Sequence, residues 1–240
     1  MRSLLAFSLL FGIRAFARLF YRRDIEWVGE VAPSLSKGVR VIAIMNHTSL
    51  YEPLLAGLAS ISLVWKVARH GVLPVAEKTM KRRIGLFFRF LMRHVVVVTR
   101  QRDHTWDEVL NRVDAKAVVT ILPEGRMKRP NGLDSTGKPM TVRGGIADIL
   151  AVVNEGKMLM VYSGGLHHIQ APGELLPRLF KTIRVRLEMI DIPTYRDQLM
   201  AESGGESFKG AVIRDLERRR DSNCPTPENL NGVTQSAVGT

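Results

Sequence analysis

The chain has 240 residues, and its 45% content of hydrophobic residues suffices for a buried core, which excludes a wholly disordered protein. Its 35 basic and 23 acidic residues give a formal net charge of +12, which favours polyanionic partners such as nucleic acid, anionic lipid or phosphorylated small molecules. The single cysteine, Cys224, excludes a disulfide framework and a cysteine-based zinc cluster. Because no uncharged apolar run approaches the roughly 20 residues of a spanning helix, an ordinary polytopic membrane protein is also excluded.

Residues 1–23 combine many large apolar side chains with charges that are all arginines. We expect an amphipathic helix that anchors the protein in the headgroup region of an anionic leaflet. A helix packed on its own domain is one alternative. A secretory signal peptide is another, since residues 15–17 imitate a cleavage site, but Arg14 interrupts the apolar run just before it.

Short β-rich runs alternate with helical stretches between residues 24 and 220. This pattern predicts an α/β fold, a single layered domain with a mostly parallel central sheet flanked by helices. The expected strands lie at 39–45, 63–68, 95–99, 117–122, 158–162 and 183–190. The expected helices lie at 52–59, 78–92, 105–113 and 145–154. Residues 221–240 are polar, contain prolines and glycines, and are expected to form a disordered tail.

The first expected strand ends in Asn46-His47, and Glu52 follows five positions after the histidine. Chemistry in parallel sheets gathers at the turns after the carboxyl ends of strands. A tight turn into a helix would let Glu52 accept the Nδ1 proton of His47, which leaves Nε2 as a base for a substrate hydroxyl. The alternative is a structural histidine beside an exposed glutamate.

Three further turns carry cations or glycines suited to an anionic ligand. The first follows the strand at 117–122, where a carboxylate and a glycine precede several cations. The second is an arginine at the end of the strand at 95–99, and the third is an arginine before a glycine pair that opens a helix. Each alone is equally consistent with a solvated basic turn. The residues concerned are Arg100, Glu124, Gly125, Arg126, Lys128 and Arg143.

Together and in this order, these motifs resemble those of the glycerol-phosphate and lysophosphatidate acyltransferase family over residues 38–192. The resemblance implies that His47 is the general base, that Glu52 orients it, and that Arg100 contacts the acceptor phosphate. It further implies that Glu124 and Gly125 form the acceptor-binding turn, assisted by Arg126 or Lys128. Neither a metal nor a cofactor is expected, because acyl-CoA or acyl-carrier protein serves as co-substrate.

Three departures from the family pattern are visible in the sequence. Glu52 replaces the usual aspartate and adds a methylene, and Pro-Glu-Gly-Arg-Met-Lys replaces the usual Pro-Glu-Gly-Thr-Arg, which moves the arginine to position 126. The proline-valine element expected near a later strand end is absent, and residues 161–165 read Val-Tyr-Ser-Gly-Gly instead. These departures concern the approach to His47 and the acceptor pocket.

The expected reaction is acyl transfer to the sn-2 hydroxyl of 1-acyl-glycerol-3-phosphate, which makes phosphatidate on the cytoplasmic face of the inner (plasma) membrane. The motifs contain no convincing nucleophile, so a covalent acyl-enzyme is not required. The same chemistry on a lyso-ornithine lipid, a lipid A precursor or another lysophospholipid is the nearest alternative. A thioester hydrolase is a further alternative. A basic nucleic-acid-binding protein is a more distant alternative, because the low aromatic content of 7% and the lack of a nucleic-acid recognition motif speak against it.

Overall fold

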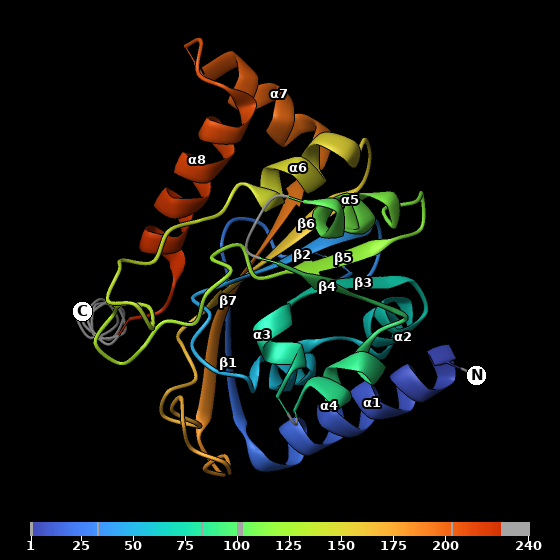
Figure 1. The fold of residues 1–240 in the computed structure, drawn as a ribbon, viewed down its shortest axis with the longest axis vertical. Coiled ribbons are helices and arrows are strands. Elements are labelled where there is room, and N and C mark those ends of the chain that lie inside the picture. The colour runs from blue at the N-terminus through green and yellow to red at the C-terminus, as the bar shows by residue number, and fades with distance from the viewer. Residues whose placement is uncertain (1, 33, 83, 100–102, 203, 227–240) are drawn as a thin grey trace, which may run out of the picture.

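A sheet in the order β1-β7-β6-β2-β5-β3-β4 forms the centre of the molecule (Figure 1). The computed structural model describes residues 2–32, 34–82, 84–99, 103–202 and 204–226. Its strands are β1 (Arg22–Trp27), β2 (Val39–Met45), β3 (Gly71–Ala76), β4 (His94–Val98), β5 (Val118–Ile121), β6 (Lys157–Ser163) and β7 (Thr182–Asp191). Only the β6–β7 pair is antiparallel among these strands, which confirms the expected mostly parallel sheet.

Helices cover both faces of this sheet, so its central strands are buried on both sides (Figure 1). One layer contains α1 (Arg2–Phe20), η1 (Glu52–Leu58), α2 (Ile61–His70), α3 (Glu77–Met80) and α4 (Ile84–Leu91). The other layer contains α5 (His104–Asn111), α6 (Gly145–Val152), α7 (Ile192–Glu202) and α8 (Phe208–Asn223). A strand enclosed in this way is a largely apolar run, as β2 is from Val41 to Met45.

The side chains of β2 divide between the two layers and thereby position the turn that follows. Ile42 and Ile44 pack toward α1 and α2, whereas Ala43 and Met45 pack toward α6 and α8. β2 lies between β5 and β6 and is parallel to both, with Ala43 opposite Ile121. The carboxyl ends of these three strands therefore meet at one edge of the sheet.

The segment 63–68 was expected as a strand, and this prediction is wrong because it lies inside α2. Ser60 caps the helix by accepting a hydrogen bond from the backbone N–H of Leu63. The buried positions within α2 are Leu63, Val64, Val67 and Ala68, which is the spacing of one helical face.

The expected helix at 78–92 also needs correction, and four elements were not expected. The single helix expected at 78–92 is instead two helices, α3 and α4, because the first ends at Met80 and the second begins at Ile84. Strands β1 and β3 and helices α7 and α8 were not expected from the sequence.

The N-terminal helix α1 is shorter than expected, since it ends at Phe20 and the next segment, from Arg22, enters β1. One side of α1 packs on its own domain through Ala6, Leu10 and Ala17. The other side leaves large apolar side chains exposed, namely Leu4, Leu5, Phe11, Phe16 and Leu19. In the described part of the chain, α1 is the one helix whose length and composition would permit it to cross a membrane. The helix thus combines packing on its own domain with an exposed apolar side.

The expected disordered tail was placed to begin at residue 221, but helix α8 extends into it. The helix begins at Phe208, after the cap residue Ser207, and continues to Asn223, three residues into the segment expected to be disordered. The following Cys224 is only 7% exposed and packs in the core, because α8 covers the α6 side of the sheet. Residues 227–240 of the expected tail lie outside the described residues.

Candidate active site

A strained turn carries the chain from β2 toward His47. Asn46 adopts a left-handed backbone conformation with φ of 65°, which asparagine tolerates better than most residues. Its side-chain amide donates a hydrogen bond of 2.9 Å to the carbonyl oxygen of Ser163, the last residue of β6. The turn is therefore fastened to the neighbouring strand, which fixes the direction in which His47 leaves the sheet.

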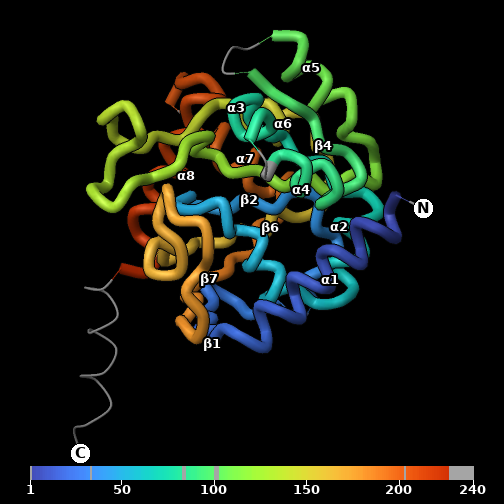
Figure 2. Tube along the Cα trace, turned by 60° about the horizontal axis from the view of Figure 1, so that its bottom comes forward, coloured from blue at the N-terminus to red at the C-terminus, as the bar shows by residue number. Residues whose placement is uncertain are grey.

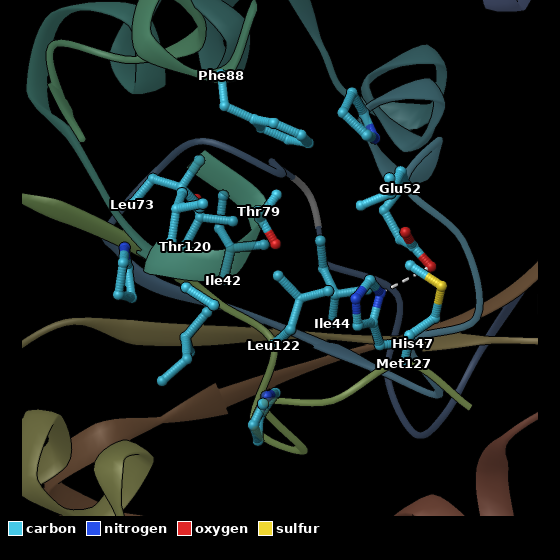
Figure 3. A pocket seen from close by; sticks show the side chains of 18 of the residues that line it. Ile42, Ile44, His47, Glu52, Leu73, Thr79, Phe88, Thr120, Leu122 and Met127 are labelled. Atoms are coloured by element: carbon cyan, nitrogen blue, oxygen red, sulfur yellow. Dashed lines mark ion pairs between the residues drawn. The ribbon is translucent and has the colours of Figure 1, made fainter. Parts of the chain in front are cut away.

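Glu52, the first residue of η1, folds back onto this turn and reaches His47 (Figure 3). Its Oε1 atom accepts backbone N–H groups of Thr48 and Ser49, each at 2.9 Å. The same atom lies 3.1 Å from Nδ1 of His47, an ion-pair contact whose angle falls outside that of a directed hydrogen bond. The extra methylene of glutamate is thus compatible with approach to the histidine.

Glu124 holds the same turn from the end of β5. Its Oε2 accepts the backbone N–H of His47 at 2.7 Å, and its Oε1 accepts that of Asn46 at 3.2 Å. The residue is 1% exposed, and burial raises the pKa of its carboxyl group, while the two backbone hydrogen bonds and Arg220, 3.8 Å away, oppose that rise. Its carboxylate therefore supports the backbone of His47.

Two opposing influences set the pKa of His47. Burial of the ring lowers the pKa, but the nearby carboxylate charges of Glu52 and Glu124 outweigh it, so the pKa is raised above the usual 6.5. The side chain of His47 keeps 17% of its surface exposed. The site thus favours the imidazolium, the form that a histidine base takes after it accepts a proton.

His47 and Glu52 line a cavity of about 1450 Å³ that lies between the sheet and the layer of α1, α2 and α4 and extends to the first turn of α6. Apolar side chains from β2, β3, α4 and the end of β5 form the wall beside the histidine (Figure 3). The labelled ones are Ile42, Ile44, Leu73, Phe88 and Leu122. A cavity of this volume and character accommodates a long apolar chain.

Cationic side chains also line this cavity, namely Lys78, Arg82, Arg126, Arg129, Arg143 and Lys209. Arg126 forms an ion pair with the buried Asp134, which neutralises much of its charge. Arg143 is exposed and has no ion-pair partner within the described residues, and Gly125 lies beside its side chain with φ of 61°. Arg143 is accordingly the better placed of the two arginines to bind an external anion.

The remaining residues expected at the site are placed differently. Lys128 contributes its backbone, whose N–H donates to the carbonyl oxygen of His47 at 2.7 Å, and it is not among the residues that line the cavity. Arg100 lies outside the described residues. The structure therefore brings His47, Glu52, Gly125, Arg126 and Arg143 together around one cavity.

Three residues at the site were not expected from the motifs. Lys209 and Arg220 come from α8, a helix without a clear apolar stripe in its sequence, so their charges gave no signal. Gln170 accepts a hydrogen bond from the buried hydroxyl of Ser49 and lines the cavity. It belongs to the irregular segment after β6, where no periodic pattern marks individual side chains.

Comparisons with known proteins show the family and the fold of this chain. The sequence model of the Acyltransferase family matches residues 28–154, more than half of the chain. The chain therefore belongs to the acyltransferase family, as its motifs predicted, and it is an O-acyltransferase. The crystal structure of the 1-acyl-sn-glycerophosphate (LPA) acyltransferase PlsC from Thermotoga maritima has a similar fold, with a TM-score of 0.53 and 18% sequence identity over 89% of this chain and 79% of that one. Among curated protein sequences, no match was found.

Replacing Glu124 with Gln should lower the free energy of unfolding by about 1–3 kcal/mol, because one of the two backbone N–H groups loses its acceptor. Urea unfolding followed by circular dichroism measures this change. The matched control is Glu155→Gln, which removes a carboxylate that is 78% exposed and should change stability by less than about 0.5 kcal/mol. Equal stabilities of the two variants would contradict the supporting role of Glu124.

Proposed function

We propose that this acyltransferase moves a fatty acyl group from an acyl thioester to the sn-2 hydroxyl of 1-acyl-glycerol-3-phosphate and so makes phosphatidate. The observation that carries the proposal is the His47–Glu52 pair at the wall of a large apolar cavity that also has cationic lining residues. The apolar space suits an acyl chain, the histidine suits a hydroxyl, and the cations suit a phosphate. Membership of the acyltransferase family supports the same conclusion.

His47 acts as the general base in the proposed reaction. Glu52 faces Nδ1, so Nε2 is the nitrogen that takes the proton from the acceptor hydroxyl as its oxygen attacks the thioester carbonyl carbon. The tetrahedral intermediate then collapses, the carbon–sulfur bond breaks, and the imidazolium returns the proton to the leaving thiolate. Glu52 orients the ring and stabilises its positive form during this cycle.

The oxyanion of the intermediate needs hydrogen-bond donors, and the first turn of α6 is the better of two candidates. The backbone N–H of Gly125 already donates to the carbonyl oxygen of Leu122 at 2.9 Å. Gly144 and Gly145, by contrast, line the cavity at the start of α6, where the first backbone N–H groups have no partner within the helix. In enzymes of acyl transfer, one such donor contributes roughly 3–4 kcal/mol.

The remaining partners follow from the same chemistry. Acyl-CoA or acyl-carrier protein supplies the thioester, and a lysophospholipid supplies the hydroxyl. The exposed apolar side of α1, with its arginines, rests on an anionic membrane surface, at the cytoplasmic face of the inner membrane. Arg143 binds the acceptor phosphate, and Glu124 and the backbone of Lys128 hold the turn that carries His47.

Replacing His47 with Ala should abolish acyl transfer while the fold is retained, since His47 is the one histidine among the described residues that line the cavity. Purified protein is incubated with acyl-CoA and lysophosphatidate, and the lipid products are identified by mass spectrometry. The control is His104→Ala, an exposed histidine on α5 outside the cavity, which should keep normal turnover. Normal turnover in the His47 variant would disprove the mechanism, and free fatty acid without phosphatidate would show a hydrolase. Product formed only from another lysolipid in an acceptor panel would reassign the acceptor.

The pH dependence of kcat/KM tests the Glu52–His47 contact. A base works only when deprotonated, so the rate should rise with pH and its midpoint should lie above 6.5. In Glu52→Gln the carboxylate charge is lost, so the pKa of His47 falls and the midpoint moves to lower pH, together with a lower kcat. Glu108→Gln, at an exposed ion pair on α5, should leave the midpoint in place. A midpoint that does not move in Glu52→Gln would refute the contact.

Arg143→Ala should raise KM roughly tenfold for lysophosphatidate, because a charge-assisted hydrogen bond to phosphate is lost. KM for a 1-acylglycerol that lacks the phosphate should stay unchanged, and initial rates with both acceptors measure the difference. Arg112→Ala, which removes an exposed cation at the C-cap of α5, serves as the matched control. Equal changes with both acceptors would remove Arg143 from the phosphate site.

A further inference from the structure

An exposed apolar surface lies in the segment 171–180, between β6 and β7. Four of its large side chains face solvent: Leu175 is 84% exposed, Leu176 76%, Phe180 68% and Leu179 38%. Folded proteins in water rarely leave several neighbouring large apolar side chains exposed without a binding partner.

This segment continues the exposed apolar side of α1. The backbone N–H of Phe180 donates to the carbonyl oxygen of Phe20 at 2.8 Å, and the two rings are 5.9 Å apart. Figures 1 and 2 both place the segment beside the C-terminal end of α1. That end of the helix exposes Leu19 at 74% and Phe16 at 36%. These side chains define one surface, which we call the docking surface: Phe16, Leu19, Leu175, Leu176, Leu179 and Phe180.

Cations flank the docking surface. Arg22 and Arg23 begin β1 one residue after α1 ends, Arg178 belongs to the segment and Lys181 follows it, and all four are exposed. Within the segment 171–180 the one acidic residue is Glu174, which pairs with Arg178 and accepts the backbone N–H of Ala171. An apolar surface bordered by lysine and arginine complements a leaflet that contains anionic phospholipid.

The inner side of the same segment forms part of the cavity wall. Pro172, Gly173, Glu174 and Leu175 line the cavity that contains His47. The hydroxyl of Tyr51 donates to the carbonyl oxygen of Leu175 at 2.8 Å, which ties the segment to the turn between β2 and η1. A surface that binds the bilayer at this place therefore brings the cavity wall to the leaflet.

We propose that the segment 171–180 is a second membrane-binding element, which inserts its apolar side chains into an anionic leaflet together with the C-terminal half of α1. The inference rests on the proposed function, because it places a cavity for a lysophospholipid at the surface where that lipid resides. An acceptor drawn from the leaflet then reaches His47 without crossing water. The occupant of the docking surface is the bilayer, and not an acidic carrier protein or a second copy of the chain.

An environment-sensitive fluorophore attached at Leu176→Cys tests the proposal in the full chain. The native Cys224 is buried and takes up little label, and the unsubstituted protein, treated with the same dye, measures that background. Vesicles of phosphatidylcholine with phosphatidylglycerol should shift the emission to shorter wavelength and raise its intensity, and brominated acyl chains should quench it. The matched control is Met200→Cys, a methionine that is 54% exposed, and its label should not respond. It belongs to α7, which Figure 1 shows at the end of the molecule far from β1 and the end of α1.

The double variant Leu176→Ser/Phe180→Ser should bind the same vesicles at least about tenfold more weakly in a sedimentation assay. A label at position 176 that ignores vesicles, while one at Leu19→Cys responds, would overturn the role of the segment. A response to acyl-carrier protein alone or to protein concentration, without a response to vesicles, would assign the surface to a protein partner. Vesicle binding is measured without substrate, and wild-type turnover in detergent tests the proposed function separately, so the two failures are distinguishable.

Discussion

Two buried carboxylates hold the turn between β2 and η1, and the chemistry of the site depends on them. Glu52 binds the backbone of Thr48 and Ser49 and faces Nδ1 of His47, while Glu124 binds the backbone of Asn46 and His47. A buried carboxylate is costly unless it accepts hydrogen bonds, and here backbone amides donate to Oε1 of Glu52 and to both oxygens of Glu124. The same negative charges raise the pKa of the imidazole against the effect of its burial. One arrangement therefore both orients the imidazole and stabilises its protonated form.

The sheet brings these groups together from distant parts of the sequence. β2 and β5 are parallel neighbours, with Ala43 opposite Ile121, so the residues that follow both strands meet at one edge. Helix α8 then adds Arg220 beside Glu124 and Lys209 beside the first turn of α6. The site is thus assembled from the family segment at 28–154 and from a C-terminal helix beyond it. On the opposite face of the sheet, α1, η1 and α4 enclose the apolar part of the cavity.

The sequence predicted the parts of this arrangement that leave a local pattern. The buried run of β2, followed by His47 and Glu52, predicted that these two side chains would meet, and the turn after β5 predicted that Glu124 would be close. The sequence did not show that Glu124 accepts hydrogen bonds from backbone N–H groups, because hydrogen bonds between distant segments leave no local sequence pattern. Residues 63–68 were misassigned because a short apolar run fits a strand and a helical face equally well. The edge strand β1 and helix α8 were missed because their charged residues mask any apolar period.

Direct titration of the His47 imidazole by nitrogen NMR, with the signal assigned by its loss in His47→Gln, tests the central claim most closely. The account predicts a midpoint above 6.5, since Glu52 and Glu124 outweigh burial, and a neutral form whose proton sits on Nδ1, which faces Glu52. A midpoint below 6.5, or a neutral form with its proton on Nε2, would contradict the claim that this ring is a base oriented by the buried carboxylate.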